Sequence, residues 1–174
     1  MKTLTQQLSQ YAAYHRDKRN IHTHFVGIPM IVFAVLILLS RPALDLGLLT
    51  ATPALLAVVL SSAYYLVLDR RYGLVMLTLL VLLLLLARPL AEGTTTLWLG
   101  WGIGLFVIGW IIQFIGHYYE GRKPAFVDDL IGLAIGPLFV VAEAGFLLGL
   151  RPEVEKEIIY QVGPTLIREH LGRP

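Results

Sequence analysis

Hydrophobic and polar positions follow one another along the chain in long blocks. The apolar blocks cover residues 25–40, 51–68, 73–91 and 97–116. Each approaches the roughly 20 residues that an α-helix needs to cross the hydrocarbon of a bilayer. The polar breaks between them contain charged and turn-forming residues: Arg41-Pro42, Asp69-Arg70-Arg71 and Glu92-Gly93-Thr94. The pattern therefore predicts four membrane-spanning helices joined by short connections.

The segment before the first apolar block has the period of an amphipathic helix. Within residues 1–22, Leu4, Leu8, Tyr11 and then Tyr14 or His15 recur at intervals of three and four. This spacing places them on one helical face. We expect residues 1–24 to form an interfacial helix on the membrane surface.

The last third of the chain is less regular. Residues 126–150 form a fifth apolar block that contains Asp128, Asp129 and Glu143 and is interrupted by Gly136-Pro137. Irregular backbone at membrane depth needs protein or water to satisfy its polar groups, so this block is expected to be a kinked span or a re-entrant segment. Residues 151–174 predict an amphipathic helix with these apolar residues on one side: Ile158, Ile159, Val162, Leu166 and Ile167. His170 in this segment is interpreted as incidental.

Composition agrees with a membrane protein. Of the 174 residues, 56% are hydrophobic and 15% are charged, and the mean hydropathy is +0.70, well beyond the balance of an ordinary soluble domain. No polar linker divides the chain, so we expect one all-α membrane domain, a polytopic helical bundle with four to five spans. A net charge of +2 is too small to indicate nucleic-acid binding.

The distribution of lysine and arginine predicts the orientation. With four spans, one side of the membrane holds eight basic residues: Lys2, Arg16, Lys18, Arg19, Arg70, Arg71, Arg122 and Lys123. The other side holds Arg41 and Arg88. Because cytoplasmic loops are enriched in basic residues, we expect an integral protein of a bacterial inner membrane with a cytoplasmic N-terminus.

Small residues recur at four-residue spacing in three places. The pairs are Gly100 and Gly104, Gly132 and Gly136, and Gly145 and Gly149. In membranes this spacing lets helix backbones approach closely. We interpret the pairs as packing positions rather than as ligand sites.

Four of the five histidines flank the predicted spans. His15, His22 and His24 precede the first span and His117 follows the fourth, so an even number of crossings brings all four to one membrane face. Ionisable groups at membrane depth are costly and usually pair inside a bundle. Neutral imidazole binds iron, zinc, copper and nickel, and the absence of cysteine excludes thiolate ligands. We therefore predict one shared metal site.

The spacing of these histidines along the chain indicates which of them are the better candidates for metal ligands. His117 and Glu120 are three residues apart and lie on one helical face, so they can act at one centre. His22 and His24 share a side only in an extended segment and diverge by about 200° in a helix. His24 lies nearer the membrane and is the preferred ligand, with His22 kept as a further candidate.

Polar neighbours of the histidines have predicted supporting roles. Asn20 and Glu120 are expected to orient the ligand rings by accepting their second N–H, and Asp17 is a further supporting candidate next to them. Arg122 and Lys123 follow His117 closely and could receive a substrate carboxylate. The same two cations could instead be topology signals or bind lipid phosphate.

Two motifs resemble one known family. The first reads H-x4-N-x3-H-x2-G-x-P and consists of His15, Asn20, His24, Gly27 and Pro29. The second reads G-H-x2-E-x-R-K-P-A and consists of Gly116, His117, Glu120, Arg122, Lys123, Pro124 and Ala125. Together they look like the small membrane proteins long described as a domain of unknown function, which include the fungal 2-hydroxy-fatty-acid dioxygenase of phytosphingosine breakdown. The resemblance covers about residues 5–150.

The resemblance implies an Fe(II)-dependent dioxygenase that uses O2 to shorten a 2-hydroxy fatty acid by one carbon with release of CO2. It implies His15, His24 and His117 as iron ligands and has no matching position for His22. With Glu120, the three ligands form the expected catalytic set. A ferrous ion with few protein ligands keeps positions for the substrate hydroxyl and carboxylate and for O2. The acyl chain would lie among the spans.

Two other classes fit the same residues. A zinc-dependent membrane hydrolase could use the histidines as ligands and Glu120 as general base. A non-catalytic membrane scaffold or small transporter could use them only to line a polar interface. A haem protein fits less well, since the motifs give no clear pair of axial ligands. The sequence indicates neither the substrate chain length nor the oligomeric state.

Overall fold

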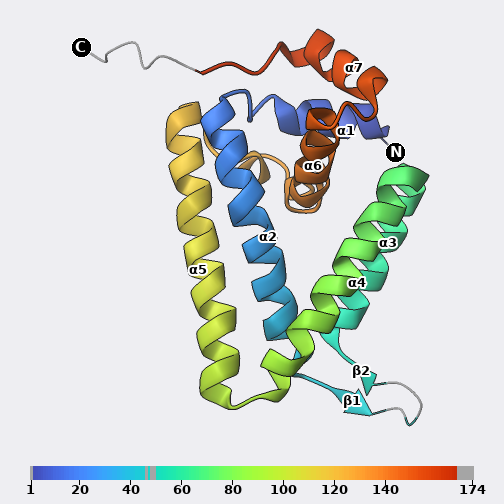
Figure 1. Ribbon diagram of the computed structural model, residues 1–174, viewed down its shortest axis with the longest axis vertical. Helices are drawn as coiled ribbons and strands as arrows, with labels where there is room; N and C mark the ends of the chain where they lie inside the picture. Colours follow the sequence, from blue (N-terminus) through green and yellow to red (C-terminus); the bar gives the residue numbers. More distant parts are fainter. Residues whose placement is uncertain (1, 46, 48–49, 168–174) are drawn as a thin grey trace. The chain divides into compact units, whose positions relative to one another are not determined.

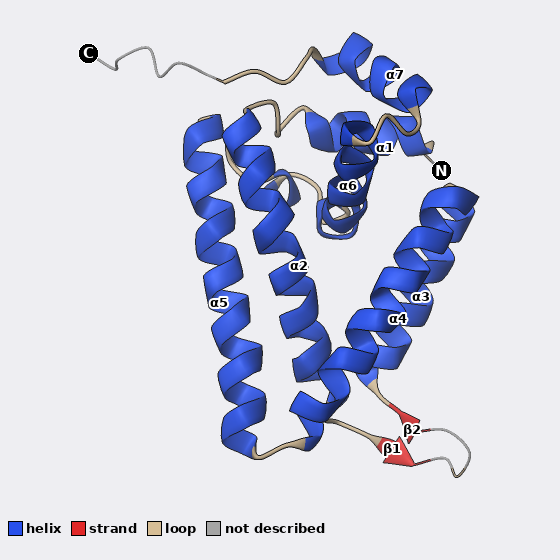
Figure 2. Cartoon of the chain, in the orientation of Figure 1, coloured by secondary structure: helices blue, strands red, loops and turns tan. Residues whose placement is uncertain are grey.

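The computed structural model describes residues 2–45, 47 and 50–167; His170 lies outside them. Apart from one short hairpin, the regular elements of the described chain are all helices, which confirms the predicted all-α class (Figures 1 and 2). In order, the elements are α1 (Leu4–Ala12), α2 (Lys18–Ser40), β1 (Leu44–Asp45), β2 (Thr50–Ala51), α3 (Pro53–Leu68), α4 (Arg70–Glu92), α5 (Thr95–Glu120), the 3-10 turn η1 (Ala125–Val127), α6 (Gly132–Leu147) and α7 (Pro152–Val162).

Long apolar helices make this a membrane-integrated chain. In the described part, α2, α4 and α5 are each long and apolar enough to span a bilayer. α3 is apolar but has only 16 residues, or about 24 Å at 1.5 Å per residue, against about 30 Å of hydrocarbon. The helices α6 and α7 together pass the same test but meet at 113°. Length and composition thus give three spans, or four if the bent pair counts as one, so the lower end of the expected four to five is reached only with the bent pair.

Contacts divide the chain into two compact units, and α2 and α5 each contribute to both. The first unit contains residues 1–28 and 111–174, and the second contains residues 29–110. All the histidines discussed above belong to the first unit. The two units are described separately.

The second unit is organised around the hairpin of α3 and α4. Thr52 caps α3, with Pro53 as its first residue, and the Asp69 carboxylate accepts from Tyr72 N at 2.9 Å to cap α4. These caps satisfy backbone N–H groups that have no partner inside the helices. Gly73 lets the two helices approach closely, since a Cβ there would lie 2.6 Å from Leu66 Cα and N.

The glycine pairs differ in whether they lie at close packing contacts. A Cβ added at Gly100 or Gly104 would meet nothing within 4 Å among the described atoms, so the packing role predicted for that pair is wrong within this chain. Its neighbour Gly102 instead faces the Leu38 side chain. Gly136 does sit at a close contact, because a Cβ there would lie 2.9 Å from the Tyr11 hydroxyl. Spacing alone therefore did not identify which glycines pack.

In the first unit, the predicted N-terminal helix is interrupted. α1 ends at Ala12 and α2 starts at Lys18, so His15 lies in the connection and His24 lies inside α2. The C-terminal elements also differ from the prediction. Pro137 is inside a continuous α6, and the bend falls instead between Gly149 (φ +72°) and Pro152.

The C-terminal helix is shorter than predicted. α7 ends at Val162, and the next residue, Gly163, has a φ of +82°, a non-helical value that glycine adopts readily because it has no Cβ. Leu166 and Ile167 therefore lie beyond it. Leu166 forms a parallel bridge with Asp17, in the connection that precedes α2.

The close approach at Gly73 predicts a specific loss of stability. In Gly73→Ala the new methyl group would collide with the backbone of Leu66, which cannot rotate away. We expect the free energy of unfolding to fall by about 1 to 3 kcal/mol. Gly104→Ala is the matched control and should cost nothing, because its Cβ enters open space. Thermal unfolding in detergent compares the two variants, and equal midpoints would contradict the packing described here.

Candidate metal centre

His15 is fixed by the end of α1. Its imidazole stacks on the Tyr11 ring, with centroids 4.1 Å apart and planes 6° from parallel. Its Nδ1 lies 2.7 Å from the Tyr11 carbonyl oxygen. Phe139 of α6 closes another side, 5.6 Å from the imidazole centroid. The side chain is fully buried, so both its position and its orientation are set by α1 and α6.

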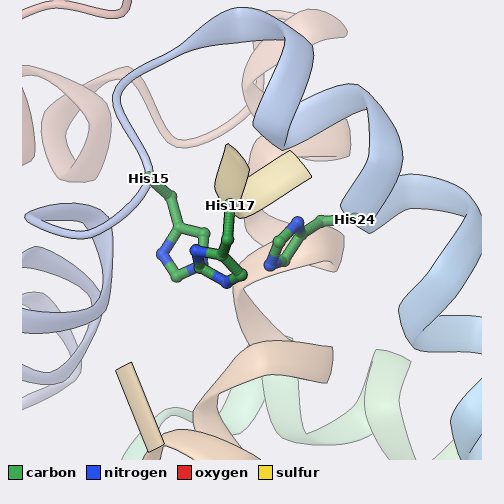
Figure 3. A group of neighbouring side chains, drawn as sticks. All are labelled: His15, His24 and His117. Carbon is green, nitrogen blue, oxygen red and sulfur yellow. The ribbon is translucent and has the colours of Figure 1, made fainter. Parts of the chain in front are cut away.

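Three imidazoles that are distant in sequence meet at this place (Figure 3). His24 comes from the second turn of α2 and His117 from the last turn of α5. Ring centroids are 4.5 Å apart for His15 and His24, 5.0 Å for His15 and His117, and 5.2 Å for His24 and His117. One nitrogen from each ring lies within 4.8 Å of the others. Exposures are 0, 1 and 7% for His15, His24 and His117.

Backbone carbonyls determine which ring nitrogens carry hydrogen. A carbonyl oxygen can only accept, so His15 Nδ1 donates to Tyr11 O and His24 Nδ1 donates to Asn20 O at 2.8 Å. The Nε2 atoms of these two rings then carry lone pairs in the neutral form. His15 Nε2 and His117 Nδ1 are buried and have no hydrogen-bond partner among the described residues. Burial, followed by the neighbouring His24, holds the pKa of His15 well below its usual value, so this ring is neutral at pH 7.

These features fit a divalent transition metal. Buried polar atoms in native proteins are nearly always hydrogen-bonded, and a metal ion would satisfy the unpartnered nitrogens together. The second N–H of a metal-binding histidine typically donates to a carbonyl or carboxylate, as His15 and His24 do. Three neutral nitrogen donors suit iron, zinc, copper or nickel. In the described chain, no carboxylate or cysteine joins this cluster.

Glu120 ties the end of α5 to the connection that carries His15. Its Oε2 accepts from Arg16 N at 2.9 Å, from Asp17 N at 2.8 Å and from Asn20 Nδ2 at 3.1 Å. The carboxylate is 1% exposed. Arg16 and Asp17 immediately precede α2, where N–H groups lack helical partners and favour a negative charge. This contact explains why one continuous N-terminal helix does not form.

Asn20 forms hydrogen bonds with both helices that carry a histidine of the site, α2 and α5. Its side-chain Nδ2 donates to Glu120 and, at 3.3 Å, to Tyr14 O, while its backbone carbonyl accepts from His24. Gly116 provides the space, because a Cβ there would overlap Thr23 Oγ1 and Asn20 Oδ1. The contribution of Asn20 to ring orientation thus comes from its main chain, whereas the sequence suggested its side chain.

The other predicted site residues lie apart from the three histidines. His22 is exposed, because α2 is already helical there and residues two apart point in different directions. Asp17 is buried but binds Arg19, with Oδ2 2.8 Å from Nη2. Arg122 donates to Ala13 O at 2.8 Å, and Lys123 pairs with Asp128.

Arg122 and Lys123 therefore brace the connection before α2. Lys123 and the Tyr14 hydroxyl both donate to Asp128, and these hydrogen bonds hold the pKa of that carboxyl below its usual value. Both cations are exposed. They remain at the polar end of the site rather than among the rings.

Sequence reasoning missed Arg16 and the C-terminal segment. The buried Arg16 side chain donates through Nε to Ala12 O and His15 O and through Nη1 to Gly163 O, and Nη2 lies 3.6 Å from Glu143 Oε1. Leu166 N donates to Arg16 O, and Lys18 N donates to Leu166 O, each at 2.9 Å. Residues 163–166 thus form hydrogen bonds with the backbone next to His15, and we call this contact the clasp. Only the position of Arg16, directly after a motif histidine, hinted at this role.

Comparison with known proteins gives two matches. The family described as "Mpo1-like: 2-hydroxy-palmitic acid dioxygenase Mpo1-like" matches residues 1–147. The 2-hydroxy-palmitic acid dioxygenase MPO1 of Saccharomyces cerevisiae (strain ATCC 204508 / S288c) is 36% identical over 155 residues, which are 87% of this chain and 85% of the yeast protein. No solved structure matches the chain significantly. Gly163 and Leu166 lie beyond the family match.

The three hydrogen bonds to Glu120 predict an indirect role in metal binding. In Glu120→Ala the backbone N–H groups of Arg16 and Asp17 lose their acceptor, so His15 is held less firmly. We expect metal affinity to fall about 10- to 100-fold, as for other groups that orient metal ligands. Glu120→Gln keeps an acceptor oxygen and should lose less. Chelator competition with the purified protein measures both, with the exposed Glu157→Ala as control; unchanged affinity in Glu120→Ala would refute the role.

The clasp at Leu166 predicts a smaller effect. Leu166→Pro removes the N–H that binds the Arg16 carbonyl and leaves the Leu166 carbonyl in place. One lost hydrogen bond, worth about 1 kcal/mol, should weaken metal binding by roughly 5-fold. Ile167→Pro is the matched control, because its amide makes no hydrogen bond among the described residues. The same competition titration should separate the two, and equal affinities would show that the clasp does not support His15.

Proposed function

The chain belongs to the Mpo1-like family of 2-hydroxy-palmitic acid dioxygenases, and from this premise we propose that it is an Fe(II)-dependent dioxygenase of 2-hydroxy fatty acids. The observation that carries the proposal is the buried group of His15, His24 and His117. Two of its nitrogens lack any other described partner. A neutral, nitrogen-only ligand set of this kind leaves coordination positions for substrate and O2.

The proposed reaction is balanced without a further reductant. One 2-hydroxy acid and one O2 give the fatty acid that is one carbon shorter, one CO2 and one H2O. The bond between C1 and C2 breaks, C1 leaves as CO2, and C2 is oxidised to the new carboxyl carbon. C2 loses three electrons and C1 loses one, and these four electrons reduce O2. Bound iron would supply the redox chemistry and a chelation site for the hydroxyl and carboxylate.

The protein's own residues would prepare the site in three ways. The carbonyls of Tyr11 and Asn20 hold two imidazoles with their lone pairs available. Burial of the rings excludes water, which strengthens electrostatic interactions and suppresses side reactions. The Glu120 carboxylate places a negative charge beside the connection that carries His15, partly balancing a bound cation.

The substrate would enter with its polar head at the site and its hydrocarbon chain toward the apolar side chains at membrane depth. Arg122 and Lys123, exposed at the polar end, would attract the carboxylate as it approaches. We place this end on the cytoplasmic side, in agreement with the excess of basic residues there. The proposed ligand set is three histidines without His22.

Zinc hydrolysis with Glu120 as general base receives no support from the geometry. Glu120 Oε2 accepts three hydrogen bonds from N–H groups, and among the described residues no carboxylate oxygen lies with the three imidazole nitrogens that could hold a metal ion. The carboxylate is better placed to hold the connection than to activate water.

The proposal is tested by loading the purified protein with Fe(II) without air and then adding O2. With 2-hydroxypalmitic acid, we expect O2 uptake matched by equal amounts of CO2 and of the 15-carbon acid; palmitic acid should give none. His24→Ala should lose metal and turnover, whereas His22→Ala should keep both, since His22 is exposed. Equal uptake with palmitic acid, or turnover supported by zinc alone, would overturn the proposed chemistry.

A further inference from the structure

One polar side chain on α5 is not explained by the metal ligands. Between residues 97 and 116, Gln113 is the only residue with an amide, hydroxyl or charged group. Its side chain lies in the first unit with the three histidines. Polar residues inside membrane-spanning helices are costly, and they usually mark substrate or ion sites.

The side-chain amide of Gln113 is buried, and its N–H2 group donates no hydrogen bond to the described residues. The residue is 4% exposed, and its Nε2 has no hydrogen-bond partner among the described residues. A buried N–H2 group with no acceptor destabilises the fold, and such groups in native proteins call for an explanation. Leucine or methionine at this position would avoid that cost, so the amide is expected to have a partner that comes from outside the chain.

Helix geometry places Gln113 next to the metal site. Gln113 and His117 are four residues apart and lie on one face of α5. The same face carries Gly116 and Glu120, and all four residues are buried. One turn of helix is about 5.4 Å, so Gln113 lies about one turn from His117 along α5, on the side away from the end of the helix at Glu120.

The polar head of a 2-hydroxy acid matches this arrangement. If the hydrocarbon chain extends to membrane depth and the carboxylate faces the polar end, the C2 hydroxyl lies on the membrane side of the carboxylate. Gln113 is displaced from His117 in that same direction. A hydroxyl oxygen has two lone pairs, so it can accept from an amide as well as bind a metal.

We infer that the Gln113 side-chain amide donates a hydrogen bond to the C2 hydroxyl oxygen of the substrate and so selects 2-hydroxy acids over unsubstituted fatty acids. The inference rests on the proposed function and adds a specificity residue to it. A site that hydrogen-bonds a substrate hydroxyl rejects the analogue that lacks it, because the amide is then left without a partner. Gln113 touches substrate rather than metal in this assignment.

The test compares binding of 2-hydroxypalmitic and palmitic acids to the Fe(II)-loaded protein without O2, so that no turnover occurs. Gln113→Leu removes the donor at similar size. We expect the preference for the hydroxy acid to fall about 5- to 10-fold, with metal content unchanged and an unfolding midpoint at or above that of the wild type. Tyr118→Phe removes a hydroxyl from the exposed side of the same helix and should change none of these.

The possible outcomes distinguish a failure of the Gln113 assignment from a failure of the proposed dioxygenase function. If the wild type turns over 2-hydroxy acids but Gln113→Leu keeps its full binding preference, the Gln113 assignment is wrong and the proposed function stands. Loss of metal or a lower unfolding midpoint in Gln113→Leu would make Gln113 a structural residue and also overturn the assignment. A wild type that neither prefers nor consumes 2-hydroxy acids would overturn both.

Discussion

The hydrogen bonds of one buried carboxylate organise the first unit. Glu120, at the end of α5, accepts from two backbone N–H groups just before α2 and from the Asn20 side chain. These contacts join parts of the chain that are about 100 residues apart. They end the N-terminal helix, start α2, and fix the connection from which His15 projects. The relative positions of His15, His24 and His117 all depend on this junction, because each ring is carried by a backbone segment that the junction joins.

The buried polar groups near the three histidines are of two kinds, those with hydrogen-bond or ion-pair partners and those without. Most are satisfied by neighbours: Arg16 binds carbonyls of α1, of the connection and of residue 163, and Asp17 pairs with Arg19. These contacts lower the cost of burying charge. The remaining groups include His15 Nε2, His117 Nδ1 and Gln113 Nε2. These atoms are buried without hydrogen bonds, which is energetically unfavourable. A bound metal and the polar head of a substrate would remove that cost, and this supports the proposed site.

Much of the site could be read from the chain before any coordinates. The two histidine motifs and their resemblance identified the family. The helical spacing of His117 and Glu120 placed them on one face of α5, but Glu120 binds the connection before α2 instead of joining His117 at the histidine group. His24 was preferred over His22 because it lies nearer the membrane, and the structure places only His24 with the other rings. Local periodicity failed in the N-terminal segment and after residue 150. There, a tertiary contact at Glu120 and a positive φ at Gly163 ended helices that their apolar spacing would have continued.

The sequence by itself determined the all-α class, the membrane-integrated character and the residue types available to hold a metal. These properties depend on hydropathy, composition and local period, which are written in neighbouring residues. The predicted even number of crossings brought the histidines to one membrane face, but only the tertiary structure decided which three imidazoles meet, that Glu120 holds a backbone connection, and that residues 163–166 bind the segment beside His15. Such contacts join residues with no regular spacing, and they form where helix packing brings donors and acceptors within hydrogen-bond distance. Pairwise proximity of this kind has no signature in a single chain's pattern of polar and apolar positions.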